Sequence, residues 1–322
     1  MNIQHFRTIL ELVREADAHG ILKQTAGLTG FSGAKLLGAL QRLARYQAEL
    51  NGGCYLEIGV FQGLTLISVA SAIPAAPAYG IDNFASHDPE KRNLRIVESR
   101  AAANRLDNVT IINEDYEDAL EELGRHVGDR RIGLLFIDGP HDYRSQLMCL
   151  MLARQYLSDT AVIVVDDCNY RHVRLASRDF LATHEDLKLV CEYYAPCHPD
   201  NMKEADQRAA KDGWWNGVHI LAKDPLGVLD KSLPPTLRSR TLYVNDHVVH
   251  SSKYAFLAIE LVRFASLLLS LRLKPAAFAL VDLLRGLFHP PAELVGEFPL
   301  ANTFSRDLPG CRINPSLRGD VP

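Results

Sequence analysis

Acidic side chains follow two short apolar runs in the middle of the chain. Asp138 ends the first run, with His141 three residues further on, and Asp166 and Asp167 end the second, shortly before Asn169. Apolar runs of this length are typical of central parallel strands, and acids belong at the ends of such strands because a buried charge is costly. Since parallel strands place their carboxyl ends at one edge of a sheet, we expect these polar side chains to meet there.

Such a group could hold a divalent cation and a base. Oxygen ligands from Asp138, Asp166 and Asp167 would suit Mg²⁺, and the bound cation would lower the pKa of an acceptor hydroxyl. His141 could take the proton, because the ordinary pKa of histidine lies near neutrality. The alternatives are that Asp138 caps the next turn and that His141 is hydrogen-bonded within its loop. Adjacent acids point to opposite sides of an extended strand, so both Asp166 and Asp167 can bind one ion only if the strand has ended.

A turn that contains glycines, after an earlier strand, predicts a cofactor site. The run 55–58 is followed by Gly59, Phe61 and Gly63, and then by a helical pattern. Glycines let the backbone pass close to a ligand at the amino terminus of a helix. The turn lacks the GxGxxG spacing of dinucleotide sites, which makes a dehydrogenase the least favoured enzyme. Glu57 would repel a pyrophosphate but would suit the amino group of a bound amino acid.

Acids at two further strand ends extend this site. Asp82 follows the second strand and could accept hydrogen bonds from a ribose diol, as in dinucleotide-binding folds. Asp115 follows the third strand and could accept a hydrogen bond from an adenine amino group. The predicted cofactor-binding residues are therefore Glu57, Gly59, Phe61, Gly63, Asp82, Asp115 and Asp138.

The elements that must position these residues alternate between strand and helix patterns from 51 to 224. This alternation predicts an α/β fold, Rossmann-like and doubly wound, with a mostly parallel seven-stranded sheet. Residues 1–50 are predicted to form an N-terminal helical cap. Residues 225–322 are predicted to form a C-terminal helical extension, with apolar helices over 254–271 and 276–287.

The remaining segments have less regular patterns. The polar stretch 196–215 is predicted to be a lid or a solvated loop. The run Trp214-Trp215-Asn216 could form an acceptor wall or pack beneath the lid. A solvated helix start is predicted for Arg171, His172 and Arg174. The proline-rich tail from Pro290 is predicted to be irregular.

Composition narrows the class of protein. The chain has 322 residues, is 47% hydrophobic and carries a net charge of −4. Its interspersed acids and bases do not resemble the basic footprint of a nucleic-acid-binding protein. Cys54 and Cys149 lie in apolar patterns typical of reduced core thiols, which favours a cytoplasmic protein. The amino terminus lacks the basic-then-apolar order of a signal peptide.

The most apolar helical stretch, 254–273, is interrupted by Glu260, Arg263 and Arg272. Its uninterrupted apolar run is far shorter than the roughly 20 residues that span a bilayer. We therefore predict no membrane span and expect a helix that is buried or faces another subunit. The C-terminal helices predict a homo-oligomer, most simply a dimer. Attachment to a membrane surface is the less favoured alternative.

The turn that contains Gly59 and Gly63, called the glycine turn below, resembles the first motif of the class I S-adenosylmethionine-dependent methyltransferases. The resemblance covers about residues 50–224. Its nearest form is the branch that contains the macrocin and mycinamicin sugar O-methyltransferases and cephalosporin-hydroxylase-like proteins. The segment 158–160 departs from this branch, which has a Gly-Gly pair before the late strand. The motifs that carry the resemblance are Glu57-x-Gly59-x-x-x-Gly63, Asp138-Gly139-Pro140-His141-Asp142-Tyr143 and Asp166-Asp167.

The resemblance implies an S-adenosylmethionine-binding domain over 51–224, Mg²⁺ at the matching acids and His141 as general base. It predicts a metal-dependent O-methyltransferase that acts on a hydroxyl of a small molecule, a sugar or another natural product. The catalytic residues would be His141 and Asp138, and the cofactors S-adenosylmethionine and Mg²⁺. The alternatives are a metal-independent N- or O-methyltransferase and a noncatalytic scaffold that binds the cofactor.

Overall fold

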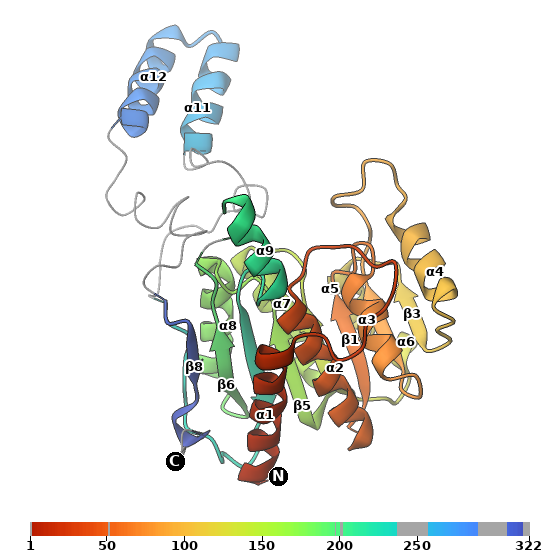
Figure 1. Cartoon of the computed structure of the whole chain (residues 1–322). Coiled ribbons are helices and arrows are strands. Elements are labelled where there is room, and N and C mark those ends of the chain that lie inside the picture. Colours follow the sequence, from red (N-terminus) through yellow and green to blue (C-terminus); the bar gives the residue numbers. More distant parts are fainter. Residues whose placement is uncertain are drawn as a thin grey trace.

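The computed structural model describes residues 2–50, 52–196, 198–199, 202–236, 257–288 and 308–317. Its centre is an eight-stranded sheet with the strand order β3-β2-β1-β4-β5-β7-β6-β8 (Figure 1). The strands are β1 (Cys54–Ile58), β2 (Ala78–Ile81), β3 (Val109–Ile112), β4 (Ile132–Ile137), β5 (Leu157–Val165), β6 (Leu187–Tyr193), β7 (Val218–Lys223) and β8 (Cys311–Ile313).

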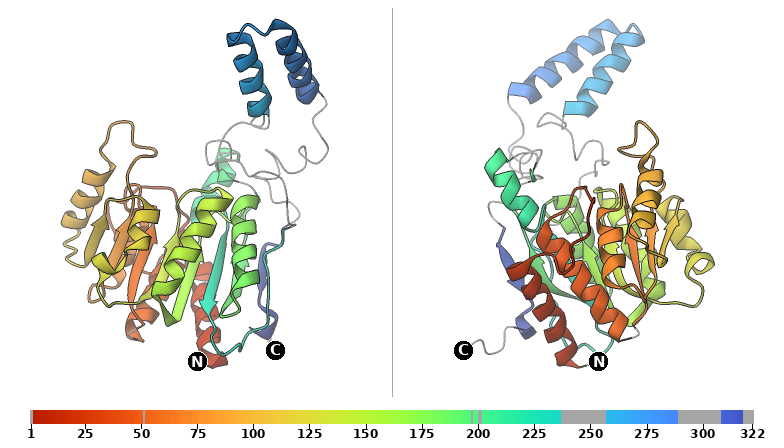
Figure 2. Two further views of the ribbon diagram at one scale, coloured as in Figure 1. Left: turned by 180° about the vertical axis from the view of Figure 1, so that it is seen from behind. Right: turned by 45° about the vertical axis from the view of Figure 1, so that its right-hand side comes forward.

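Helices cover both faces of the sheet (Figure 2). One face carries α1 (Ile3–His19), α2 (Ala34–Glu49), α3 (Leu64–Ala72) and α4 (Asn93–Ala103). The other face carries α5 (Tyr116–Glu121), α6 (Gly124–Val127), α7 (Tyr143–Ala153) and α8 (Arg171–Thr183). The remaining helical segments are η1 (Arg154–Tyr156), α9 (Glu204–Asp212), α11 (Ala258–Leu269), α12 (Leu273–Phe288) and η4 (Pro315–Leu317).

Alternation along the central strands divides the core into two layers. In β4, Leu134 and Phe136 pack in the layer of α1 to α4, and Leu135 and Ile137 pack in the layer of α5 to α8. All four side chains are at most 1% exposed. Successive strand residues point to opposite faces, so a strand between two helical layers is apolar at every position. The first charged side chain of this segment therefore comes at Asp138, where the strand has ended.

The predicted Rossmann-like α/β fold is confirmed in its coarse form. β1 to β5 pair in parallel with their neighbours, whereas β7 is antiparallel to both β5 and β6. The predicted count of seven strands is wrong, because the C-terminal tail returns and adds β8 antiparallel to β6. An edge strand offers unpaired backbone groups to such a segment, and an ion pair between Glu192 and Arg312 joins the two strands. The irregular tail predicted from Pro290 therefore contains a strand.

The segments near the last strands are more ordered than predicted. The stretch 196–215 contains α9 and ends at two buried tryptophans, so it is not merely a solvated loop. The predicted solvated helix start is wrong for His172 and Arg174, which are 8% and 7% exposed. α8 packs against the sheet through this end, and carbonyl groups accept hydrogen bonds from the Arg174 guanidinium.

The two C-terminal helices correspond to α11 and α12, which stand apart from the sheet domain as an antiparallel pair (Figures 1 and 2). The predicted residues 254–256 and Pro290 lie outside the described residues. Within the described ranges, no helix combines the length and apolar character needed to cross a bilayer.

Candidate active site

The strand order reverses between β1 and β4, which are neighbours in the sheet. The chain leaves β1 toward α3 on one face and leaves β4 toward α7 on the other face. Loops that diverge in this way leave a crevice at the carboxyl ends of the strands, where ligands of open α/β sheets bind. The glycine turn and Asp138 therefore lie at the edge of the sheet where a ligand is expected.

Gly59 lets the glycine turn pass directly against the end of β4. Its φ is +90°, and a Cβ at this position would lie 1.9 Å from the backbone oxygen of Asp138. Any other residue would have both a strained backbone and a steric clash. The close approach brings the predicted cofactor turn into contact with the backbone of the predicted acceptor site.

Glu57 lies inside the sheet, with none of its surface exposed. One carboxylate oxygen accepts a hydrogen bond from the Tyr55 hydroxyl at 2.6 Å, and the other accepts one from the Thr65 hydroxyl at 2.6 Å. Burial raises the pKa of Glu57 to about 8, although these hydrogen bonds act to lower it. The carboxylate thus joins β1 to the first turn of α3. Its contact with the amino group of a ligand stays a prediction.

The two other predicted cofactor acids also have partners within the protein. Oδ2 of Asp82 accepts hydrogen bonds from the backbone N–H groups of Val60 and Phe61, both at 2.8 Å, and so holds the glycine turn in shape. Asp115 is the N-cap of α5 and accepts a hydrogen bond from a backbone N–H of its first turn. Both carboxylates retain further acceptor capacity, so the contacts with ribose and adenine stay predictions.

Asp138, His141 and Asp167 meet at the carboxyl ends of β4 and β5. Nε2 of His141 lies 2.6 Å from Oδ2 of Asp167 and 3.9 Å from Oδ1 of Asp138. Burial raises the pKa of Asp138 to about 6. Burial also acts to raise the pKa of Asp167, but the charge and hydrogen bonding of His141 outweigh it and lower this pKa to about 2. The environment thus separates the pKa values of the two carboxyl groups, and Asp167 loses its proton at a lower pH than Asp138.

Asp166 lies outside this group. Asp167 has a φ of +57°, so the chain has left the extended strand conformation when it reaches this residue. Asp166 is 1% exposed, and its Oδ1 accepts the backbone N–H of Asp167 at 2.8 Å. Burial, together with the charges of Asp138 and Asp167, raises the pKa of Asp166 well above its ordinary value. Among the described residues, one possible metal donor from each of three side chains lies within 4.8 Å of the others, those of Asp138, His141 and Asp167. Asp166, which the sequence predicted as a metal ligand, is not in this group.

Buried polar side chains hold the turn that carries Asp167. Asn216 donates a hydrogen bond from Nδ2 to Oδ1 of Asp167 at 2.8 Å. Arg174 donates to two backbone carbonyls of the turn, those of residues 168 and 169. Asn169 lies just after β5 and pairs with the backbone of Ala195, beyond the end of β6, through both ends of its amide. The roles of Asn216 and Arg174 were missed because their partners depend on how β7 and α8 pack.

Aromatic rings form a series from the glycine turn to His141. We call it the aromatic arc, and in order it consists of Phe61, Phe31, Trp215, His198, Tyr170 and His141. Successive ring centroids lie 5.3, 6.3, 6.3, 5.9 and 5.4 Å apart. Tyr170 is buried, whereas Phe31 is 62% exposed. The arc therefore runs from the predicted cofactor turn to the predicted base, with its most accessible ring at Phe31.

The two tryptophans at the end of the lid segment have different surroundings. Trp214 stacks on Tyr193 with the ring centroids 4.3 Å apart, and its indole N–H donates to Asp17 at 2.8 Å. Trp215 contacts Phe31 within the aromatic arc. Trp214 thus packs against β6 and α1, and the predicted acceptor wall stays a prediction.

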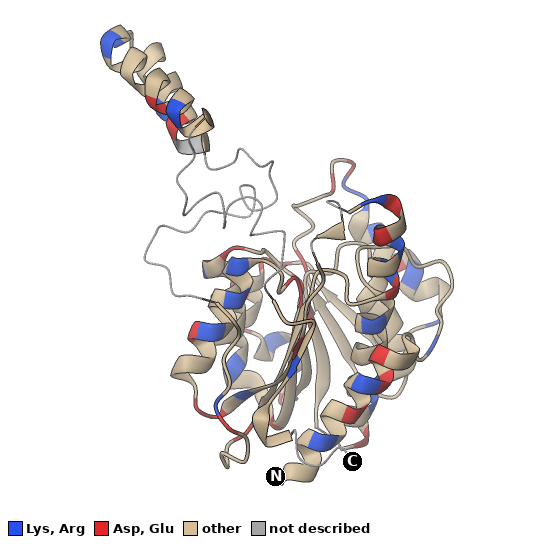
Figure 3. Ribbon diagram, turned by 60° about the vertical axis from the view of Figure 1, so that its left-hand side comes forward, with Lys and Arg blue, Asp and Glu red and all other residues tan. Residues whose placement is uncertain are grey.

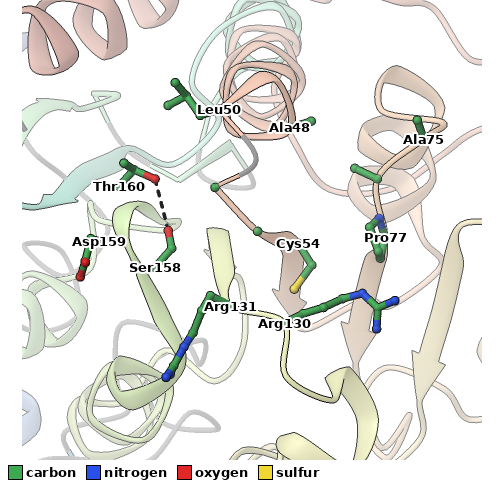
Figure 4. Close-up of a pocket in the computed structure, with 13 residues that line it drawn as sticks. Ala48, Leu50, Cys54, Ala75, Pro77, Arg130, Arg131, Ser158, Asp159 and Thr160 are labelled. Atoms are coloured by element: carbon green, nitrogen blue, oxygen red, sulfur yellow. Dashed lines mark hydrogen bonds between the residues drawn. The ribbon is translucent and has the colours of Figure 1, made fainter.

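A cavity of about 610 Å³ lies at the opposite, amino-terminal edge of the sheet (Figure 4). It is lined by Cys54 at the start of β1, by Arg130 and Arg131 before β4, and by Ser158 and Thr160 early in β5. None of the predicted site residues lines this cavity. The candidate active site is therefore the carboxyl edge of the sheet, where the glycine turn and the group of Asp138, His141 and Asp167 lie.

Residues 56–168 match a protein family described as a methyltransferase domain. This segment begins in β1 and ends just after β5, so it contains the glycine turn and the group of Asp138, His141 and Asp167. This match, over about a third of the chain, supports an S-adenosylmethionine-dependent methyltransferase. A comparison with curated proteins gives no match.

Solved structures with a similar fold include two O-methyltransferases. One is TomG from Streptomyces achromogenes, which is involved in tomaymycin synthesis and was solved with S-adenosylmethionine. It has 19% sequence identity to this chain and a TM-score of 0.44, and the match covers 69% of this chain and 90% of TomG. The other is an O-methyltransferase from Bacillus cereus in complex with S-adenosylhomocysteine; it has 15% identity and a TM-score of 0.44, over 69% of this chain and 91% of that one. Similarity at this level does not bear on the acceptor.

Proposed function

We propose that the protein is an O-methyltransferase in which His141 deprotonates the acceptor hydroxyl. The observation that supports this best is the 2.6 Å contact between His141 Nε2 and Asp167 Oδ2. A carboxylate that stays ionised beside an imidazole orients the ring and stabilises its protonated form. A hydroxyl must lose its proton to attack a methyl group efficiently, so a base held in this way favours methylation of oxygen.

The reaction is a single displacement. The acceptor oxygen forms a bond to the methyl carbon while the bond from that carbon to the sulfonium sulfur breaks, and the hydroxyl proton passes to His141. The products are the methyl ether and S-adenosylhomocysteine. We place the cofactor at the glycine turn, with Gly59 and Gly63 allowing its close approach and Glu57, Asp82 and Asp115 as its polar contacts. The acceptor hydroxyl is then held beside the methyl group, which supplies the proximity that the displacement needs.

The aromatic arc supports an acceptor that carries a ring. Flat aromatic side chains stack on other rings and on the apolar faces of sugars. Phe31 and Trp215 lie between the glycine turn and the base, where they can position a bound ring. The proposed acceptor is thus a hydroxylated ring compound, a sugar or another natural product, in keeping with the resemblance of 138–143 to the macrocin and mycinamicin branch.

Metal assistance is a second candidate, favoured by the grouping of Asp138, His141 and Asp167. Two carboxylates fit Mg²⁺ or Mn²⁺, and an imidazole also suits Fe²⁺ or Zn²⁺. A divalent cation bound there would lower the pKa of the acceptor hydroxyl. Asp138 and Asp167 would provide its oxygen ligands.

The proposal is tested with purified protein, S-adenosylmethionine and a panel of catechols, flavonoids and hexose-bearing compounds, with S-adenosylhomocysteine release as the readout. We expect at least one ring hydroxyl to be methylated and S-adenosylhomocysteine to bind in calorimetry. Absence of binding at high micromolar S-adenosylhomocysteine would rule out the whole proposal. Methylation of amines alone would rule out the assignment to oxygen.

A further inference from the structure

The pair formed by α11 and α12 exposes apolar side chains that the sheet domain leaves uncovered. The two helices pack on each other, and Ala276 and Ala279 of α12 are buried. Several large side chains remain in solvent, among them Phe278 at 64% and Phe288 at 71% exposed. Figure 3 shows that the pair carries few charged residues compared with the helices of the sheet domain. Exposed apolar surface of this kind marks a site of interaction with a protein or a membrane.

The turn between the two helices, taken here as residues 269–274, carries three exposed leucines, two of which are the most exposed large apolar residues of the described pair. Leu269, Leu271 and Leu273 are 86%, 82% and 64% exposed. Leu271 has a φ of +56°, in the left-handed region that favours glycine or asparagine. An exposed position with this backbone conformation gives folding no reason to select leucine. The leucines of the turn therefore point to contact with something outside this chain.

Basic residues alternate with these leucines. Arg272 and Lys274 are exposed in the turn, and the sequence from 261 to 281 contains no acid. The acids of the helices lie away from the turn and have partners on their own helices. Glu260 pairs with Arg263 at 3.4 Å, and Asp282 pairs with Arg285 at 3.8 Å. The turn is thus both apolar and positively charged.

We propose that this turn docks on an anionic lipid bilayer. A bilayer interface accepts leucines below the level of its phosphates, while arginine and lysine remain at the phosphates. Two basic residues near an anionic surface strengthen binding by electrostatic attraction. Both ends of the pair lead back to the sheet domain, through the chain after β7 and before β8, and Figures 1 and 2 show the turn at the end far from the sheet.

A second copy of this chain is the rival occupant, as in the predicted homo-oligomer. Two copies joined with their turns side by side would bring the like charges of Arg272 and Lys274 together, which is unfavourable. Two copies joined with opposite orientation would leave the turn in solvent and so would not account for its leucines. The charge of the turn therefore favours the lipid surface.

The test is flotation of the full chain with vesicles of phosphatidylcholine alone or mixed with phosphatidylglycerol. We expect binding to the mixed vesicles, roughly tenfold or more above binding to the neutral ones at low salt. The triple variant L269S/L271S/L273S should lose binding to both, and R272Q/K274Q should lose only the preference for phosphatidylglycerol. The control is Leu226→Ser, which changes a leucine of the sheet domain that is 67% exposed and should leave binding unchanged.

Two accompanying measurements separate the outcomes. Circular dichroism and binding of S-adenosylhomocysteine should match the wild type in every variant, since the changed residues lie far from the crevice. Light scattering reports the oligomeric state. Equal binding to both vesicle types, or a dimer that ignores vesicles and dissociates in the triple serine variant, overturns the proposal. Neither result would affect the proposed methylation, which is measured separately.

Discussion

Nε2 of His141 lies 2.6 Å from Oδ2 of Asp167, and this contact joins the loop after β4 to the turn after β5. Two ligands of one octahedral Mg²⁺, each about 2.1 Å from the ion, lie about 3 Å apart. The observed separation is shorter, so it fits a direct ion-pair contact between the two side chains. A cation that used both side chains as ligands would have to open it.

Removing either member of this pair should abolish most of the activity. We expect His141→Gln and Asp167→Asn to lower kcat by about 10²- to 10⁴-fold, the usual contribution of a positioned base. Affinity for S-adenosylhomocysteine should stay within about twofold, because neither residue belongs to the glycine turn. Asp166→Asn is the matched control: asparagine keeps the side-chain oxygen that accepts the backbone N–H of Asp167, so this variant should keep most of its activity. Loss of activity in D166N alone would contradict the assignment of the base.

Metal assistance predicts a response to chelation. We expect dialysis against EDTA to lower activity at least tenfold and Mg²⁺ or Mn²⁺ to restore it, because a Lewis acid makes the acceptor hydroxyl more acidic. Asp138→Asn should abolish the restoration, since it removes one of the grouped donors. Activity that is unchanged by EDTA would assign the reaction to the pair of His141 and Asp167 without a metal.

The buried Glu57 should make stability depend on pH. Its pKa is about 8 in the folded protein, against an ordinary value of 4.5. Between these pH values the folded state keeps the proton and the unfolded state has released it, so Glu57 lowers the free energy of unfolding as the pH rises, by up to about 1.4 kcal/mol per pH unit. Glu57→Gln has no proton to lose. In urea titrations across this range, we expect the wild type to lose stability relative to E57Q, and parallel curves would disprove the raised pKa.

The same residue can report on the cofactor. If Glu57 becomes ionised to meet the amino group of the ligand, binding of S-adenosylhomocysteine near pH 7 releases a proton. Calorimetry in buffers with different enthalpies of ionisation should then show proton release for the wild type and much less for E57Q. Equal proton exchange in the two proteins would place the amino group elsewhere.

Gly59 should tolerate no side chain. Gly59→Ala would place its Cβ against the backbone oxygen of Asp138, whereas Gly27→Ala, at a φ of +75°, meets nothing within 4 Å. We expect G27A to cost about 1 kcal/mol of stability, from its left-handed backbone alone. G59A should cost several times more or fail to fold, as thermal denaturation would show. Equal losses in the two variants would mean that the turn can move away from β4.

Phe31 should act on the acceptor and not on the fold. Because it is 62% exposed, Phe31→Ala should leave the melting temperature nearly unchanged while raising KM for a ring-bearing acceptor several-fold. Leu22→Ala, at a residue of the same loop that is 40% exposed, serves as the control. An unchanged KM in F31A would remove the aromatic arc from acceptor binding.

The succession of β1 to β7 along the chain and the ends of the central strands could be predicted from the sequence. The apolar run before Asp138 is continuous because both faces of β4 are buried, and the charge comes where the burial ends. Gly59 was predicted in a turn close to a ligand, and its positive φ agrees with that turn. These features depend on local patterns of polarity and on the conformational freedom of glycine.

Contacts between distant segments could not be predicted in the same way. The strand β8 joins the sheet because β6 has an open edge, which its own sequence does not reveal. Arg174 was wrongly predicted to be solvated. Its guanidinium reaches the backbone carbonyls of residues 168 and 169 only when α8 packs beside the turn, and the local sequence does not reveal this packing.

The sequence by itself determined that Asp138, His141, Asp166 and Asp167 gather at one edge of the sheet, since strand ends follow from the burial of the strands. Only the tertiary structure decided which of the two adjacent acids belongs to the group. The left-handed backbone at Asp167 turns that carboxylate toward His141, while Asp166 is buried and accepts a backbone hydrogen bond. The difference arises from one backbone dihedral angle and from the packing around it, and neither can be read from two identical residues in a row.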